Sequence, residues 1–108
     1  MKHYTGTISA TFAEKLKEKG MPMMECYNIT PSNSFSDDDG VRFYYLPTFG
    51  ACFDWLMSNR RITIVVEPSF YEQYLSKIYN KDRFVKGFDG NTWHEAANAA
   101  IEKALTLI

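Results

Sequence analysis

The sequence predicts a single α+β domain of two layers, in which about three helices cover a three- or four-stranded, mainly antiparallel sheet. Apolar residues recur at helical spacing in three separate segments. The segments between them include runs rich in β-branched and aromatic residues, which is typical of strands. A chain of 108 residues has the size of one domain, so we assign residues 1–108 to one unit.

The first helix is predicted over residues 9–19. Thr11 is followed three residues later by a glutamate, which is the spacing of a capping box at a helix start. Phe12 and Leu16 then fall on one side of the helix, and Gly20 suits the left-handed position that commonly follows a helix.

The chain between the first and second helices is predicted to hold two short strands and a loop. Residues 23–29 form the first of these strands. Residues 31–40 are rich in serine, asparagine and aspartate, so we expect a mobile loop there, apart from Phe35. Residues 41–46 are aromatic and β-branched, which predicts the second strand.

The second helix is predicted over residues 47–59, with Pro47 in its first turn. Its apolar positions at helical spacing are Phe49, Cys52, Phe53, Leu56 and Met57. Residues 62–66 are nearly all β-branched and form the strongest predicted strand. We expect this strand to be central in the sheet and to end at Pro68.

Residues 69–80 fit two structures. A capping-box pattern and apolar residues at helical spacing favour a helix, whereas the high tyrosine content and a turn at residues 67–70 favour a strand that pairs back on the preceding one. We favour a strand over residues 72–79, then a short strand at 83–86 and a turn at 87–91.

The last helix, predicted over residues 92–108, has the clearest signal. Thr92 and Glu95 form a capping box. The helical spacing places on one face Trp93, Ala97, Ala100, Ile101, Ala104, Leu105 and Ile108. The predicted core of the whole domain comprises Phe12, Leu16, Phe49, Cys52, Phe53, Leu56, Ile62, Ile64, Val66, Trp93, Ala97, Ile101 and Leu105.

Three stretches, at residues 12–20, 46–56 and 92–105, resemble pieces of a group of small uncharacterised proteins from phages and prophages of gut bacteria. The most specific of them reads Thr-Trp-His-Glu-Ala-Ala-Asn-Ala-Ala-Ile-Glu-Lys-Ala-Leu. The resemblance implies a gene from a mobile element, a cytoplasmic product and a small α+β domain. It also implies an extended segment after the central strand. It carries over no catalytic residue.

Charge and composition restrict the possible compartment and ligands. The net charge of −1 argues against a domain whose main task is to grip a phosphate backbone. Two cysteines are too few for a secreted disulfide scaffold. The N-terminus shows no apolar signal segment, and no apolar run approaches the ~20 residues that span a bilayer. We therefore expect a protein of the bacterial cytoplasm with no membrane partner.

No residue pattern predicts a reactive site. His3 and His94 lack metal-ligand spacing, as do Cys26 and Cys52, so we expect no metal and no cofactor. The acidic turn at residues 37–40 lacks the alternating oxygen ligands of a calcium loop. We predict no catalytic residue.

Three functions remain as hypotheses. The leading one is a non-enzymatic module that binds a host or phage protein, or a second copy of itself, through an exposed aromatic patch. The first alternative is a single-strand nucleic-acid binder, with aromatic residues on a sheet face flanked by Arg42, Arg60, Arg61 or Lys77. The second is a small enzyme, which needs a deep pocket with strongly shifted side-chain pKa values. The candidate interaction surface comprises Arg42, Tyr44, Tyr71, Tyr74, Lys77 and Tyr79.

Overall fold

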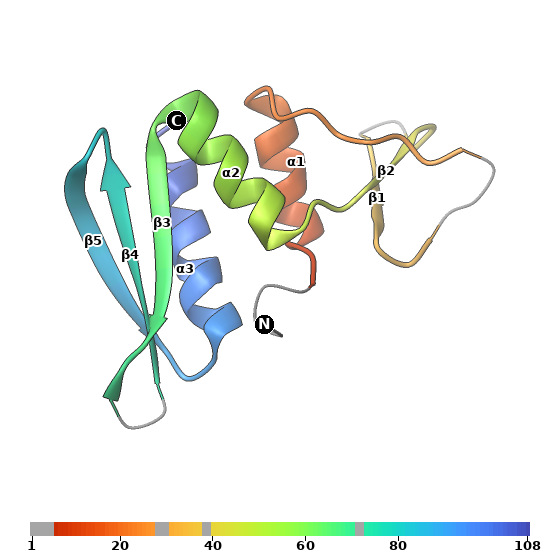
Figure 1. Ribbon diagram of the computed structural model, residues 1–108. Coiled ribbons are helices and arrows are strands. Elements are labelled where there is room, and N and C mark those ends of the chain that lie inside the picture. Colours follow the sequence, from red (N-terminus) through yellow and green to blue (C-terminus); the bar gives the residue numbers. More distant parts are fainter. Residues whose placement is uncertain (1–5, 28–30, 38–39, 71–72) are drawn as a thin grey trace.

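The computed structural model describes residues 6–27, 31–37, 40–70 and 73–108. Within these ranges the chain forms three helices and two antiparallel sheets, which confirms the predicted α+β class (Figure 1). The elements are α1 (Ala10–Glu18), β1 (Ser34–Ser36), β2 (Phe43–Tyr45), α2 (Phe49–Arg60), β3 (Ile62–Pro68), β4 (Tyr74–Asn80), β5 (Arg83–Gly90) and α3 (Trp93–Leu105). No helix in this part of the chain is long and apolar enough to cross a membrane.

The larger sheet has the strand order β3-β4-β5, with both pairs antiparallel. The predicted strand at 72–79 is confirmed as β4, which is the central strand. The prediction that residues 62–66 form the central strand is wrong, because β3 lies at an edge. The predicted turn at 87–91 is also wrong over most of its length, because β5 continues to Gly90 and thereby covers the second edge of β4.

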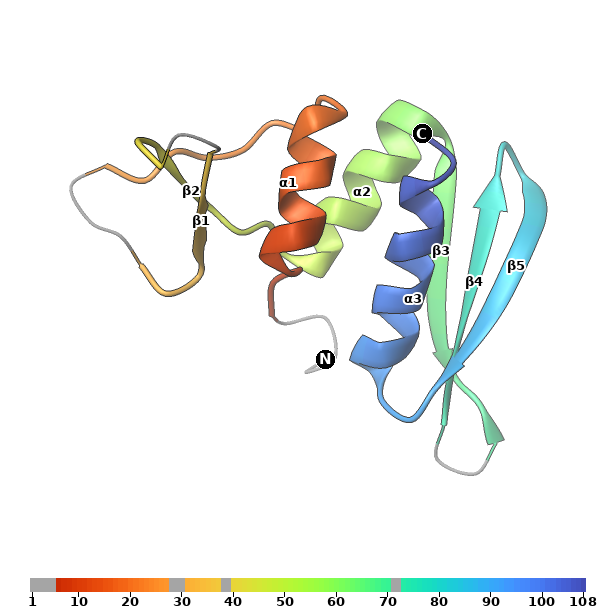
Figure 2. The same cartoon turned by 180° about the vertical axis from the view of Figure 1, so that it is seen from behind.

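The helices lie on one face of this sheet. Burial alternates along β3. Ile62, Ile64 and Val66 are buried against the helices, whereas Val65 is 39% exposed on the other side. The views from both sides show α3 along the sheet, α2 beside β3, and α1 farther from the sheet (Figures 1 and 2). No described helix covers the other face, so the larger sheet and the helices make two layers.

Helix α3 begins as predicted, with one change in its cap. The Glu95 backbone N–H donates to Oγ1 of Thr92 at 3.1 Å, but the Glu95 carboxylate accepts from the N–H of Asn91 at 2.7 Å rather than from that of Thr92. Four alanines on its inner face, Ala96, Ala97, Ala100 and Ala104, are fully buried. Small side chains there let the helix lie close to the strands.

Helix α1 is capped by a different residue from the one predicted. Ser9, not Thr11, is the N-cap, and its hydroxyl accepts from the N–H of Phe12 at 3.2 Å. The expected role of Gly20 is confirmed, because it has a φ of +104° directly after the helix. The following N–H, of Met21, then bonds back to the Leu16 carbonyl at 2.9 Å and so closes the last turn.

The cap assignment gives a first testable prediction. Ser9→Ala should lower the free energy of unfolding by about 1 kcal/mol, because one N–H at the helix start loses its partner. Thr11→Ala is the matched control, since both side chains are exposed, and it should change that free energy by less than about 0.5 kcal/mol. Urea unfolding followed by circular dichroism measures both variants. Equal losses would mean that Ser9 is not the cap.

Helix α2 begins later than predicted. Thr48 is its N-cap and accepts from the N–H of Ala51 at 3.1 Å, so Pro47 lies before the helix rather than in its first turn. The Pro47 carbonyl instead accepts from the N–H of Ile8 at 3.0 Å, which ties the segment before α1 to the start of α2.

Strands β1 and β2 form a small hairpin that projects away from the larger sheet (Figure 1). Strand β1 lies inside the predicted loop at 31–40, because Phe35 is 5% exposed and packs 5.7 Å from the ring of Tyr44. The predicted strand at 23–29 is wrong in its described part, where Glu25 and Tyr44 make a single bridge. Residues 28, 29, 38 and 39 lie outside the described part of the chain. The predicted strand at 41–46 is confirmed in the shorter form of β2.

The core is close to the predicted one. Every predicted core residue is buried except Phe12, Phe53 and Leu105, which are partly buried and pack against it. The prediction missed four large buried side chains, which are Ile8, Met21, Phe35 and Ile78. The radius of gyration is 14.4 Å, somewhat above the ~13 Å of a compact chain of this length, because the hairpin stands away from the rest.

Candidate interaction surfaces

The structure does not bring the predicted surface residues together. Arg42 and Tyr44 belong to the hairpin, whereas Lys77 and Tyr79 lie on β4 of the larger sheet. Both views of the ribbon place the helices between the two groups (Figures 1 and 2). Tyr71 lies outside the described residues.

Tyr74 also separates from the rest of its strand. It lies on the same face of β4 as Ser76 and Ile78, which are both fully buried. Tyr74 is accordingly half-buried and packs against the core. Lys77 and Tyr79 point to the uncovered side, so only these two of the predicted residues on β4 contribute to a surface there.

By the alternation of faces along the paired strands, the uncovered side of the larger sheet, here called the open sheet face, carries Thr63, Val65, Glu67, Leu75, Lys77, Tyr79, Phe84, Gly87 and Asp89. Tyr79 pairs across the strands with Phe84, and the two ring centroids are 5.7 Å apart at 68°. The Lys77 ammonium lies 2.8 Å from the Glu67 carboxylate, and this hydrogen bond raises the pKa of Lys77. Phe84 is 59% exposed.

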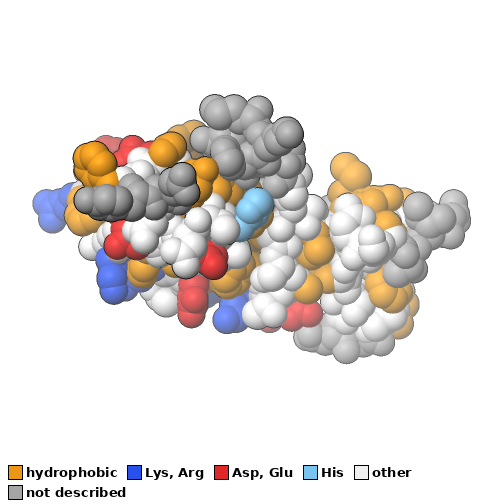
Figure 3. All heavy atoms as spheres, turned by 90° about the horizontal axis from the view of Figure 1, so that it is seen from below, with side chains coloured by type: hydrophobic (Ala, Val, Ile, Leu, Met, Phe, Trp, Pro, Cys, Tyr) orange, Lys and Arg blue, Asp and Glu red, His pale blue; other side chains and the backbone are white. Residues whose placement is uncertain are grey.

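The hairpin and the segment bridged to it carry a second patch, here called the hairpin surface, which comprises the exposed Met24, Tyr27, Val41 and Arg42 and the half-buried Tyr44. Met24 and Tyr27 are each 72% exposed and Val41 is 73% exposed. Arg42 hydrogen-bonds the Tyr44 side chain, which raises the pKa of Arg42. On the face shown in Figure 3, charged side chains gather over the sheet and helices, whereas the hairpin end carries mainly hydrophobic and uncharged ones.

An apolar groove of about 270 Å³ opens at the base of the hairpin. It is lined mainly by Met21, Met23, Met24, Tyr45, Leu46 and Ala51. Methionine side chains are flexible and polarizable, so a groove lined by several of them can adapt to differently shaped apolar groups. The sequence gives a signal for this groove only in the run Met-Pro-Met-Met.

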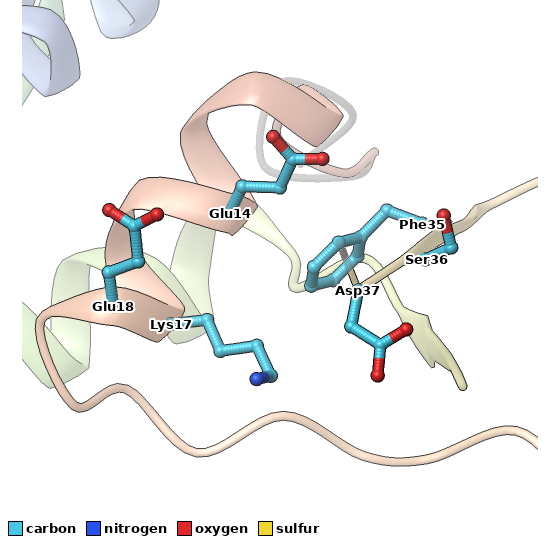
Figure 4. A pocket seen from close by; sticks show the side chains of 6 residues that line it. All are labelled: Glu14, Lys17, Glu18, Phe35, Ser36 and Asp37. Carbon is cyan, nitrogen blue, oxygen red and sulfur yellow. The ribbon is translucent and has the colours of Figure 1, made fainter. Parts of the chain in front are cut away.

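A smaller cleft of about 100 Å³ lies where α1 meets β1 (Figure 4). The Lys17 side chain extends from α1 into the cleft toward Phe35 and Asp37. Its ammonium lies 5.0 Å from the centre of the Tyr44 ring, a cation–π contact that holds the hairpin against α1. The lining residues come from both α1 and the hairpin, so the cleft marks the junction of the two.

Of the residues with reactive side chains, Cys52 lies in the core, Cys26 is half-buried and His94 is exposed. Cys52 is fully buried, and desolvation raises the pKa of its thiol to about 12, so it carries no nucleophilic thiolate at neutral pH. The His94 ring packs 5.3 Å from both Phe49 and Trp93. Among the described residues no group of three or more His, Cys, Asp or Glu side chains could hold a metal ion. His3 lies outside this part of the chain.

The buried thiol gives a second testable prediction. Above a pH of about 8.5 the thiol ionises in the unfolded chain but stays protonated in the folded one. The free energy of unfolding should therefore fall by about 1.4 kcal/mol per pH unit from this group alone, up to a pH of about 12. Urea unfolding of the wild type and of Cys52→Ala between pH 8 and 10 isolates the slope. Cys26→Ala leaves Cys52 in place and should keep the wild-type slope.

Comparisons with known proteins add no relative to these observations. No protein-family model, no curated protein and no solved structure matches the chain.

Proposed function

We propose that this protein is a non-enzymatic interaction module that binds another protein through the hairpin surface. The observation that carries the proposal is the exposure of three large apolar side chains, which are Val41 on the hairpin and Met24 and Tyr27 on the segment bridged to β2. Apolar side chains that gather on a projecting element are typical of interaction sites, whereas single ones scattered over a surface are not.

The residue types support a protein partner. Tyrosine and arginine dominate binding energy at protein interfaces, and methionine is enriched there. The hairpin surface has two tyrosines, an arginine and a methionine, and the Met-lined groove continues it toward α2.

The hairpin is also held in place before it binds. Strand β2 is hydrogen-bonded on both sides, to β1 on one side and to the segment at Met24–Cys26 on the other. On that second side the Cys26 N–H donates to the Phe43 carbonyl at 2.8 Å, and the Tyr45 N–H donates to the Met24 carbonyl at 2.8 Å. Phe35 anchors the hairpin to the core. A surface that is ordered in advance loses less conformational entropy on binding.

The resemblance to small phage and prophage proteins suggests where the partner comes from. We propose that it is a protein of the bacterial host or of the phage itself, met in the host cytoplasm. A phage protein that binds a host protein needs no catalytic group, which agrees with the burial of Cys52.

Affinity capture with matched variants tests this proposal. The tagged protein is incubated with lysate of a gut bacterium, and the bound proteins are quantified for the wild type, Tyr27→Ser and Met24→Ser. A partner should fall at least tenfold with each hairpin variant. The control is Met57→Ser, because Met57 is 51% exposed on α2, away from the hairpin. If every captured protein bound the hairpin variants as well as it bound the wild type, the hairpin surface would have no role in binding.

A further inference from the structure

We infer that the open sheet face is a separate binding site for single-stranded nucleic acid, centred on Tyr79 and Phe84. This site goes beyond the proposed function, because it lies on a different part of the molecule and takes a different class of ligand.

Phe84 provides a flat platform. A Cβ placed on Gly87 would lie 3.8 Å from Cζ of Phe84 and 3.5 Å from Cδ1 of Leu75, so these two side chains lie over the glycine. The Cζ end of the Phe84 ring therefore rests near the sheet, and the ring meets that of Tyr79 in an edge-to-face arrangement. The ring remains 59% exposed, so its outer side can accept a stacked base.

Basic residues gather at the end of the sheet where these rings lie. Lys81 and Arg83 flank the turn from β4 to β5, and the Lys81 N–H donates to the Arg61 carbonyl at 2.9 Å. All three side chains are exposed, and Arg83, which pairs with Asn80, points to the side of the sheet opposite to that of Phe84. Lys77 lies two residues before Tyr79 on the same face, but its ammonium is paired with the Glu67 carboxylate at 2.8 Å, so it adds no unpaired charge. Cations beside stacking rings are the combination that binds a phosphate backbone with its bases.

One carboxylate, that of Asp82, lies in the turn from β4 to β5, and those of Glu67 and Asp89 lie farther along the face. Asp82 lies 3.7 Å from Arg61 and is highly exposed, so the pair contributes little. Glu67 is engaged by Lys77, and Asp89 pairs with Leu75 toward the opposite end of the sheet. The strand of nucleic acid therefore lies across the turn end and not along the whole face.

The backbone at this end is kept in a conformation that long side chains disfavour. Arg61, Lys81 and Asp82 have φ angles of +56°, +52° and +69°. Glycine or asparagine adopts these angles at lower cost. Basic side chains at two of the three positions cost stability without making a buried contact, which is expected when the charges serve binding.

The area and centre of this face disfavour a protein partner. Three strands of about seven residues span a flat outline of roughly 300 Å², which is a small footprint for a partner protein. Its middle is occupied by the Lys77–Glu67 ion pair, and both residue types are depleted at the centre of protein interfaces. A short stretch of nucleic acid needs less area and tolerates water and charge.

Fluorescence anisotropy tests the site with fluorescein-labelled dT12 and U12 oligonucleotides. The wild type should bind both, and the affinity should fall about 7- to 18-fold between 50 and 200 mM KCl, as expected for two to three phosphate contacts. Phe84→Leu should weaken binding about tenfold, because it keeps an apolar side chain but removes the ring. Lys15→Gln, on α1, should leave the affinity unchanged.

Arg61→Gly separates binding from stability. Glycine suits the left-handed position after α2, so this variant should raise the melting temperature while it weakens oligonucleotide binding. Absence of binding by the wild type, or unchanged binding by both Phe84→Leu and Arg61→Gly, would overturn the inference. Equal competition by polyglutamate would also overturn it, because a plain anion patch needs no rings. A dimer in light scattering that Phe84→Leu dissociates would assign the face to a second copy instead.

Discussion

Replacing Trp93 by alanine is expected to lower the free energy of unfolding by about 3–5 kcal/mol. The Trp93 side chain is 3% exposed in the first turn of α3. Its ring lies 5.1 Å from that of Phe49 at 88° and 6.1 Å from that of Phe53, so it joins α3 to α2. Truncation removes a large buried area and two aromatic contacts, and leaves a cavity between the two helices. Urea unfolding followed by far-UV circular dichroism measures the loss.

The chain supplies its own control, because it has two tryptophans. Trp55 is half-buried on α2, with the Arg60 guanidinium 5.5 Å from its ring. Trp55→Ala should cost about 1 kcal/mol, since much of its surface is already in contact with water. Equal losses from the two variants would show that the contact between α2 and α3 is not centred on Trp93.

Local patterns predicted the helices because the interactions that fix them are local. The cap at Thr92 and the apolar spacing of α3 involve residues at most a few positions apart. The start of α1 was misassigned because two capable caps, Ser9 and Thr11, lie two residues apart. The choice depends on Ile8, which is 1% exposed and bonded to Pro47, and the sequence does not reveal that distant contact.

The order of the strands depends on long-range pairing, and the prediction that β3 is the central strand was wrong. A β-branched run such as β3 shows that one face is buried, but it does not show how many neighbours the strand has. The glycines of β5 favoured a turn. In the structure the Phe84 side chain lies over Gly87, so a residue that usually weakens a strand is covered.

The candidate surfaces were predictable in residue type but not in grouping. Once β4 is known to be a strand, the alternation of faces separates Tyr74 from Lys77 and Tyr79. Phe84 joins them only through the register of β4 with β5, which includes a bulge after Ile78. Met24, Tyr27 and Val41 are exposed because no other element packs over them in the described structure. That depends on the tertiary arrangement, which no local sequence pattern contains.

Replacing Gly90 by alanine should lower the free energy of unfolding by about 2–3 kcal/mol, although it adds a single methyl group. The new Cβ would lie 2.6 Å from the backbone nitrogen of Ala96 and 3.1 Å from the carbonyl oxygen of Thr92. Both atoms belong to backbone at the start of α3, which cannot move aside as a flexible side chain can. Thermal and urea unfolding of the variant measure the cost.

Gly50→Ala is the matched control, and it should have the opposite sign. Gly50 lies in the first turn of α2, where an added Cβ would meet only Oγ1 of Thr48 at 3.9 Å, an ordinary contact. Alanine should therefore raise the free energy of unfolding by about 0.5–1 kcal/mol, because it restricts the unfolded chain and favours the helix. If Gly90→Ala instead left the free energy of unfolding unchanged, the start of α3 would have to shift away from the end of β5. Such a shift would also displace Trp93 and the hydrogen bond from the Glu95 N–H to Thr92, and would contradict the tight packing of β5 against α3.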